Sequence, residues 1–506
     1  MRSTLPRPGI VRPTIVRPTI VRRGAALLSA VVLVAACSGG GDITDSGDGG
    51  SESTAPGETL APTTSVAPDS LPDCPTDALA GATGTVEITF WHGMSGPLGE
   101  ELTRLTDEYN ASQDKVKVTL VGESYEQTAD NYLLASQDSR PDLVQMPEYM
   151  VQAMVDTEST VPVDKCIDSS SYDTSAFLPS GLAAYSTQGV GWGMPFNISN
   201  PVLFYSRAVF EAAGLDPDAP PTSLEELREY SQKIVDSGAA KYGIVLDSGF
   251  DSGGGWYLEQ WFAKAEEFYV DNDNGRTNRA TKVLYDNQTG VDLLTFLQTM
   301  INDGLAVSVG DNAGGTDDLL KLVDQQEPGA MAIHTSAAIG GALDLLRSGA
   351  FPSFDAEDLG IGPMPGPDGK PGALIGGASL WPVNSNDPVR IAATWDYITF
   401  LVSAETQSQW AKATGYIPVR GDAADVEPYK TTLAEDPRFG VAYEQLAASP
   451  DSLTSSGPVV GPLREMRAVL ATAISQIFAG ADVATTLTDA AGQANNLIAD
   501  YNSRND

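Results

Sequence analysis

The sequence predicts an α/β protein with two lobes, between which the chain crosses more than once. The chain has 506 residues, which is long for a single core. Segments with strand-like alternation are followed by segments with helical periodicity along most of its length. Two apolar segments in mid-chain, 195–215 and 373–383, have the pattern of crossings between lobes. Hydrophobic residues make up 42% of the sequence, which is enough for a sizeable core.

Residues 1–36 have the features of an export signal. They contain six arginines and no acidic residue, and Arg22-Arg23 precedes the apolar run 25–36. This run is too short to span a bilayer as a mature helix. Its end, Leu-Val-Ala-Ala before Cys37, resembles a bacterial lipobox, which implies cleavage before Cys37 and lipidation of its thiol. An ordinary signal peptide that contains a cysteine is the alternative.

Residues 37–80 are predicted to be a disordered acidic tether, because they are rich in Gly, Ser, Thr, Asp and Pro and contain few apolar residues. The other two cysteines are Cys74 and Cys166. After export to an oxidising compartment, two such thiols tend to pair, so a disulfide is possible. Two buried free thiols are the alternative.

The charge of the chain excludes some partners. Asp and Glu number 67 against 30 Lys and Arg, and the formal net charge is −37. Such a surface repels nucleic acid and anionic lipid. We therefore expect no nucleic-acid partner, and contact with a membrane only through the lipid anchor.

The first lobe is predicted to begin with a β-α-β unit. Residues 86–90 and 116–120 alternate as strands, and the helix between them has an apolar face from 98 to 109. Such a unit favours a parallel sheet, in which ligands lie at the carboxyl ends of the strands. Another helix and a third strand, 141–146, follow.

The remaining elements continue the alternation of helices and strands. In the crossing 195–215, an extended segment leads into a short helix that ends at Gly214. Thr222 and Glu225 form a predicted capping box for the next helix. Further strands are expected at 242–246, 329–336 and 359–365, and further helices at 291–301, 317–326 and, as the last one, 463–477. The predicted lobes are 81–197 with 328–376, and 198–327 with 377–506.

The sequence gives little support for catalysis or metal binding. It has only two histidines, no Cys/His cluster with metal-binding spacing, no G-x-S-x-G motif and no P-loop. The acidic segment 271–275 fails as a calcium loop because Arg276 and Lys282 replace the required Gly and Glu. We expect no metal, no cofactor and no enzymatic activity. A secreted hydrolase with two carboxylates is the less favoured alternative.

Several segments together resemble a known family. They are FWHGMSGPLGEEL, SYEQT, QMPE, PFNISNPVLFYS with AVFEAAGLDP, IGGASLW and TGYIPV. Over about residues 85–500 the sequence is similar to the extracellular solute-binding proteins of family 1, and within them to those that bind sn-glycerol 3-phosphate for bacterial ABC importers. The resemblance implies a periplasmic-binding-protein fold of the maltose-binding type, whose two lobes close on the ligand by hinge motion.

The resemblance also implies a ligand site of eight residues. Three match groups at the glycerol end of the ligand, three match groups on its phosphate side, one matches an indole that flanks the ligand, and one serine matches loosely. In that order they are Tyr125, Glu148 and Ser199; Gly377, Tyr416 and Arg467; Trp256; and Ser336.

The chemistry of these residue types suits a phosphate ester. Such a ligand needs an arginine fork, hydroxyl donors and a glycine that lets a backbone N–H approach. The expected function is that of a monomeric lipoprotein on the outer face of the cell membrane. It would capture glycerol 3-phosphate, or a glycerophosphodiester such as glycerophosphocholine, and deliver it to the permease subunits of an ABC importer. A neutral sugar is the alternative, but it would leave Arg467 without an anionic partner.

Overall fold

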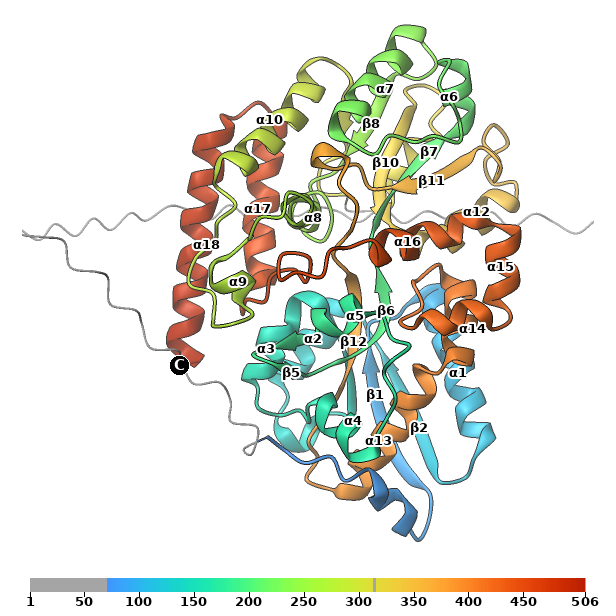
Figure 1. Ribbon diagram of the computed structural model, residues 1–506, viewed down its shortest axis with the longest axis vertical. Coiled ribbons are helices and arrows are strands. Elements are labelled where there is room, and N and C mark those ends of the chain that lie inside the picture. Colours follow the sequence, from blue (N-terminus) through green and yellow to red (C-terminus); the bar gives the residue numbers. More distant parts are fainter. Residues whose placement is uncertain (1–70, 313–314, 506) are drawn as a thin grey trace, which may run out of the picture. The chain divides into compact units, whose positions relative to one another are not determined.

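The computed structural model describes residues 71–312 and 315–505, which form two five-stranded sheets with helices packed around them (Figure 1). The strand order is β2-β1-β3-β12-β6 in the first sheet and β11-β7-β10-β8-β9 in the second. A short two-stranded sheet, β4-β5, is separate from both. The predicted α/β class is therefore confirmed.

The first sheet begins with the predicted β-α-β unit. Strands β1 and β2 pair in parallel from Val86 opposite Val116 to His92 opposite Gly122. Strand β3 pairs in parallel with β1. Strand β12 is antiparallel to both of its neighbours, β3 and β6. The elements of this part are β1 (Val86–His92), α1 (Gly96–Ser112), β2 (Val116–Gly122), α2 (Tyr125–Leu134), β3 (Leu143–Pro147), β6 (Met194–Ser199) and β12 (Gly376–Pro382).

The second sheet is also mixed. Strands β8, β9 and β10 are parallel to one another, and β7 is antiparallel to both of its neighbours, β10 and β11. Its strands are β7 (Pro201–Ser206), β8 (Tyr242–Leu246), β9 (Ala306–Ser308), β10 (Gly329–Thr335) and β11 (Leu359–Pro363).

The chain passes from the first sheet to the second at Asn200, between β6 and β7. Every residue of both strands is buried, which explains the continuous apolar pattern of this segment. The Asn200 side chain donates to Ala442 O at 2.9 Å and accepts from Gln445 at 3.1 Å. Helix α6 (Arg207–Ala212) follows β7, and Gly214, two residues after its end, has a φ of +72°. The predicted crossing into a helix is confirmed.

Strand pairing corrects the predicted lobe boundaries. Residues 329–335 form β10, which pairs with β7 and β8, so they belong with the second sheet and not with residues 81–197. Residues 376–382 form β12, which pairs with β3 and β6 of the first sheet, whereas the prediction placed most of them in the second lobe. An apolar pattern identifies a strand, but it does not specify which distant strand completes its hydrogen bonds.

Three helix predictions also need correction. The capping box is formed one residue later than predicted, by Ser223 and Glu226, at the start of α7 (Leu224–Ser237). The helix expected at 317–326 is only α11 (Asp317–Leu320). The helix 463–477 corresponds to α17 (Leu463–Phe478), but α18 (Val483–Asn505) follows it. Half of the buried residues of α18 are alanines, which give a weak apolar signal in the sequence.

The other helices surround the two sheets. They are η2 (Thr76–Gly81), η3 (Gln137–Ser139), η4 (Glu148–Met150), α3 (Val151–Asp156), α4 (Val163–Ser170), α5 (Pro179–Ala184), α8 (Trp256–Lys264), α9 (Asp271–Gly275), α10 (Gln288–Asn302), η5 (Ser336–Ala338), α12 (Ile339–Arg347), η6 (Pro367–Gly369), α13 (Pro388–Leu401), α14 (Ala404–Thr414), η7 (Gly421–Asp425), α15 (Tyr429–Glu435), η8 (Pro437–Gly440) and α16 (Val441–Ala447). The short strands are β4 (Ser186–Thr187) and β5 (Val190–Gly191). Within the described ranges, none of the helices has the length and apolarity that crossing a membrane requires.

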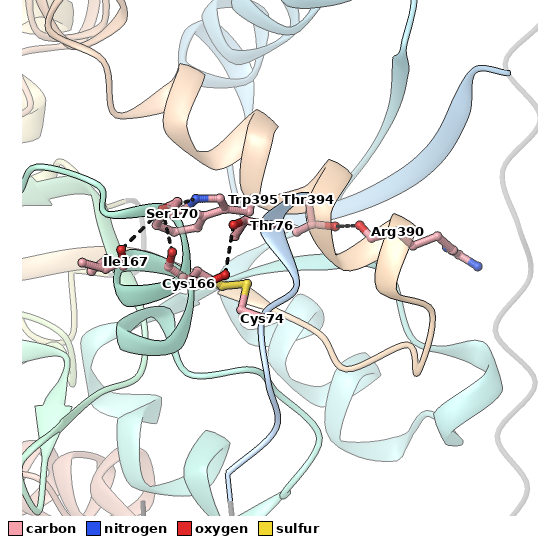
Figure 2. Close-up of a disulfide and its surroundings, with 9 residues drawn as sticks. Cys74, Thr76, Cys166, Ile167, Ser170, Arg390, Thr394 and Trp395 are labelled. Atoms are coloured by element: carbon pink, nitrogen blue, oxygen red, sulfur yellow. Dashed lines mark hydrogen bonds between the residues drawn. A yellow bond between two sulfur atoms is a disulfide. The ribbon is translucent and has the colours of Figure 1, made fainter. Parts of the chain in front are cut away.

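A disulfide joins Cys74 to Cys166 of α4, as the sequence allowed (Figure 2). The Cα atoms of the two cysteines are 4.9 Å apart. Next to the bridge, the hydroxyls of Thr76 and Ser169 are hydrogen-bonded at 3.1 Å, and η2 packs against α13. The predicted tether therefore extends too far, because residues 71–80 are held on the folded domain. Cys37 lies outside the described residues.

Candidate functional site

A buried arginine joins three elements of the structure. Arg467 on α17 is 1% exposed. Its Nε and Nη2 atoms donate to the two carboxylate oxygens of Glu259 on α8, both at 2.8 Å. Its Nη1 atom donates to Oε1 of Glu148 at 2.9 Å. Glu148 directly follows β3 of the first sheet, whereas α8 is tied to the second sheet by Tyr257, whose hydroxyl donates to Ile333 O of β10 at 2.8 Å.

These contacts change the predicted arrangement of charges. The sequence placed Glu148 and Arg467 at opposite ends of the ligand, but the two side chains are ion-paired. The expectation that a neutral ligand leaves Arg467 without an anionic partner is wrong, because Glu259 and Glu148 both pair with it. Sequence reasoning missed Glu259, since one acid among 67 gives no signal by itself. Its spacing from Trp256, three residues along α8, is the pattern that places both on one helix face.

Burial and ion pairing act against each other in this cluster. Burial raises the pKa of Glu148, and the nearby Arg467 opposes the rise. Burial also raises the pKa of Asp251, with Arg467 again acting in the opposite direction. Burial by itself lowers the pKa of Arg467, but Glu259 and Glu148 outweigh it, so the guanidinium stays charged.

A second polar group surrounds Asn197 of β6. Asn197 donates to the Tyr125 hydroxyl at 2.7 Å and accepts from Gln145 at 2.7 Å, and Gln145 in turn accepts from the Gly93 N–H at 2.8 Å. Tyr416, which follows the end of α14, is part of the same group. Burial raises its pKa, whereas hydrogen bonds with Asn197 and Tyr125 act to lower it. The structure thus brings together two predicted tyrosines through Asn197, an amide that the sequence analysis did not select.

The two glycines of the IGGAS segment allow close packing on both sides of β12. Gly377 has a φ of +90°, and a Cβ atom there would lie 2.0 Å from Asn197 O. A Cβ atom on Gly376 would lie 2.4 Å from the Trp256 indole. Gly376 is also paired with Ser199 at the end of β6. The predicted residues Trp256, Gly377 and Ser199 therefore meet along these strands.

Two predicted site residues have distinct surroundings. Trp256 is buried at the start of α8, and its Nε1 donor has no hydrogen-bond partner among the described residues. Ser336 is also buried, but its hydroxyl accepts from the Asn200 N–H at 3.3 Å and its own N–H donates to Asn200 O at 2.9 Å. The Ser336 side chain therefore holds the crossing between the sheets. Its polar group is thus used by the backbone of the crossing.

The loop that leads from β8 to Trp256 is organised by a buried acid. Oδ1 of Asp247 accepts from Gly249 N at 3.0 Å, from Gly253 N at 2.8 Å and from the Ser252 hydroxyl at 2.6 Å. Burial nevertheless raises the pKa of Asp247 to about 6, and nearby Asp318 adds to the rise. The folded protein therefore keeps this carboxyl protonated at pH values where the unfolded chain ionises it.

Between pH 4 and pH 6, we expect the free energy of unfolding to fall less in Asp247→Asn than in the wild-type protein. In the wild-type protein, the contribution of Asp247 is fully present below pH 3.8 and is lost as the pH rises through about 6. The difference between these values corresponds to about 3 kcal/mol. Asparagine keeps the acceptor oxygen but cannot ionise. Urea unfolding of both proteins at pH 4, 5, 6 and 7 measures the effect, and parallel pH profiles would contradict it.

No group of three His, Cys, Asp or Glu side chains within residues 71–312 and 315–505 has the arrangement of a metal site. The polar groups of the candidate site are instead hydroxyls, amides, an indole N–H, two carboxylates and one guanidinium. Such a set binds a small polar solute through hydrogen bonds and charge, and it holds no evident nucleophile with an activating base.

Comparison with known proteins defines the class. Residues 104–439 match the family of bacterial extracellular solute-binding proteins. The match covers more than half of the chain, so the protein belongs to this family, whose members are the non-enzymatic ligand-binding components of ABC importers. The family predicted from the motifs is thereby confirmed, as is a location outside the cytoplasm.

Particular relatives bind glycerol 3-phosphate, according to their names. The sequence is 27% identical over 431 residues to the sn-glycerol-3-phosphate-binding periplasmic protein UgpB of Pectobacterium atrosepticum, covering 83% of this chain and 92% of that one. It is 26% identical over 433 residues to UgpB of Escherichia coli O6:K15:H31, covering 83% and 94%.

Solved structures with the same fold include binders of different solutes. UgpB from Mycobacterium tuberculosis in complex with glycerophosphocholine has a TM-score of 0.66 at 21% identity, covering 83% of this chain and 100% of that one. The sugar-binding protein MalE from Xanthomonas citri has a TM-score of 0.68 at 16% identity, covering 82% and 98%. The cyclic alpha-maltosyl-1,6-maltose binding protein from Arthrobacter globiformis has a TM-score of 0.66 at 22% identity, covering 82% and 99%. These likenesses confirm the maltose-binding type of fold.

Proposed function

We propose that this protein captures a glycerol phosphate ester and delivers it to the permease of an ABC importer while a lipid on Cys37 anchors it to the membrane. The names of two relatives that each match over 83% of this chain support this ligand class. The anchor rests on the lipobox resemblance at Cys37, outside the described residues. The observation that carries the ligand proposal is the buried Arg467 fork.

The Arg467 guanidinium has donors to spare for a phosphate group. Its three hydrogen bonds to Glu259 and Glu148 leave N–H groups on Nη1 and Nη2 that are not used by these contacts. Hydrogen bonds between a guanidinium and phosphate oxygens are among the strong ones. The hydroxyls of Tyr125 and Tyr416, gathered around Asn197, supply further polar contacts for the glycerol part.

The charges of the cluster favour a diester over a monoester. Two carboxylates, those of Glu148 and Glu259, face the single guanidinium of Arg467. A phosphate monoester brings about −1.5 to −2 charges at neutral pH, so it meets more repulsion from these carboxylates than a diester with one charge does. Glycerophosphocholine has one negative charge on its phosphodiester and one positive charge on its choline. Its quaternary ammonium can approach a carboxylate or an aromatic face such as that of Trp256.

One observation favours a neutral sugar as a second candidate. Glu148 and Glu259 already satisfy the charge of Arg467, so an anionic ligand is not required for this arginine to be buried. Carboxylates accept hydrogen bonds from sugar hydroxyls, and a tryptophan face can pack on a sugar ring. We rank this candidate second because the sequence relatives described above are named for glycerol 3-phosphate.

Isothermal titration calorimetry on residues 38–506 separates these ligands. We expect glycerophosphocholine to bind with a Kd in the micromolar range, about −8 kcal/mol, and sn-glycerol 3-phosphate to bind more weakly. We expect no heat of binding with maltose. Tight binding of maltose together with no response to either phosphate ester would refute the proposed ligand class and favour the sugar.

A further inference from the structure

One buried hydroxyl near the site is not explained by the fold. Tyr185 lies at the end of α5 and is fully buried, with 0% of its surface exposed. Its hydroxyl has no hydrogen-bond partner among the described residues. A buried polar group without a partner costs free energy, about 1–3 kcal/mol, so its presence needs a reason.

The surroundings of this hydroxyl place it with the ligand site. Glu148 and Tyr416 are the two groups whose charges raise the pKa of Tyr185, after burial itself. One of them is ion-paired with Arg467, and the other belongs to the polar group around Asn197. Packing supports this placement, because α5, the helix that Tyr185 follows, contacts β6, the strand that carries Asn197 and Ser199.

The backbone on both sides of Tyr185 is held by Arg276. Nη1 of Arg276 donates to Ala183 O at 2.7 Å and to Ser186 O at 2.8 Å, and Nη2 donates to Ala184 O at 3.4 Å. These are the main-chain carbonyls of the two residues before Tyr185 and of the one after it. Because α5 packs against β6, the clamped segment belongs with the first sheet.

The same guanidinium reaches a second segment of the chain. Nε of Arg276 donates to Gly457 O at 2.8 Å, and Nη2 also donates to Ser456 O. Residues 456 and 457 precede α17, the helix that carries Arg467. Arg276 thus fixes the Tyr185 segment relative to the segment that leads to the central arginine of the site.

We propose that Tyr185 is a further ligand-contacting residue, whose hydroxyl donates a hydrogen bond to an oxygen of the bound solute, and that Arg276 is its positioning residue. This inference rests on the proposed function, since the solute oxygen is that of a phosphate ester or of its glycerol part. It explains why the protein buries a hydroxyl without an internal partner: the solute supplies the acceptor.

A matched control is present in the same chain. Tyr285 is also 0% exposed, and its hydroxyl also has no hydrogen-bond partner among the described residues. After burial, Asp286 is the group that raises its pKa, and its ring packs on Tyr269. Tyr269 is influenced by the charges of Glu259 and Arg467, but Tyr285 is not, so Tyr285 lies one side chain further from the site. Tyr285→Phe therefore removes a comparable hydroxyl that does not interact directly with the charged groups of the site.

Calorimetric titration of the wild-type protein, Tyr185→Phe and Tyr285→Phe with glycerophosphocholine, sn-glycerol 3-phosphate and maltose tests the inference. For the probe that the wild-type protein binds best, we expect Tyr185→Phe to raise Kd about tenfold, as for the loss of one hydrogen bond to a charged group. Tyr285→Phe should leave Kd within about twofold. Both variants keep the ring, and thermal unfolding checks that both are folded.

The role of Arg276 is tested by a double-mutant cycle. Arg276→Lys should weaken binding, and adding Tyr185→Phe to it should have less effect than in the wild-type background. Independent effects of the two changes would overturn the positioning role.

The outcomes for Tyr185 separate this inference from the proposed function. Unchanged or tighter binding by Tyr185→Phe would overturn the contact. If the wild-type protein binds only maltose, the proposed ligand class fails. The maltose titrations of Tyr185→Phe and Tyr285→Phe then test whether Tyr185 contacts the solute. If no probe binds to the wild-type protein, both are refuted.

Discussion

Arg467→Ala is expected to destabilise the ligand-free protein by about 3–5 kcal/mol, which is the range for removing one partner of a buried ion pair. Glu259 is 2% exposed, and its two oxygens both accept from Arg467. Without the guanidinium, this carboxylate would remain buried and uncompensated. The proposed role of Arg467 implies loss of ligand binding, and its ion pairs add this loss of stability.

Urea unfolding at pH 7 without ligand measures this effect. Arg464→Ala is the matched control, because Arg464 lies on the same helix but pairs with Asp130 at the surface, so its removal should cost at most about 1 kcal/mol. Combining Arg467→Ala with Glu259→Gln should restore part of the stability, since the buried charge is then absent. A wild-type unfolding curve for Arg467→Ala would show that the ion pairs do not support the fold.

The same variants separate stability from binding. In the double variant the fold recovers in part, but the guanidinium that we assign to the phosphate group is still missing. We therefore expect no recovery of glycerophosphocholine binding. Arg467 thus has two roles, one in stability and one in ligand binding. The double variant distinguishes them because it restores part of the stability but not the binding.

Local patterns predicted most of the secondary structure. The β-α-β unit and the crossing at 195–215 depend on alternation, helical periodicity and turn residues that lie close together in the chain. The partners of β10 and β12 depend on segments far away in the sequence, so the predicted lobe boundaries failed there. Strand identity is a local property, whereas sheet membership is not.

The candidate site shows the same limit at the level of side chains. Family resemblance selected Glu148 and Arg467 but did not reveal that they form an ion pair, because that contact needs the two chain segments in place. Asn197, Glu259 and Tyr185 were missed for a related reason. Each is an ordinary polar residue in sequence, and it becomes conspicuous only through burial and partners.

The second large effect is expected from removing the disulfide. Cys74 and Cys166 are separated by 92 residues, and the bridge closes this long loop in the unfolded chain. Replacing both with alanine should lower the free energy of unfolding by about 2–4 kcal/mol, mainly because the unfolded chain gains freedom. Denaturant unfolding of the wild-type and double-alanine proteins measures the difference.

Ligand affinity should respond differently from stability in this variant. Both cysteines are buried, Cys74 just before η2 and Cys166 within α4, and the bridge attaches the first described segment, residues 71–81, to the first sheet's helices (Figure 2). None of the hydrogen bonds of Arg467, Asn197 or Arg276 involves that segment. We therefore expect the Kd for glycerophosphocholine to stay within about twofold at 25 °C, because changes at separate sites that share no partners have nearly independent effects. A large change in Kd would mean that the disulfide holds the site as well as residues 71–81. With unchanged Kd, its role is to hold residues 71–81 on the folded domain without involving the residues that bind the solute.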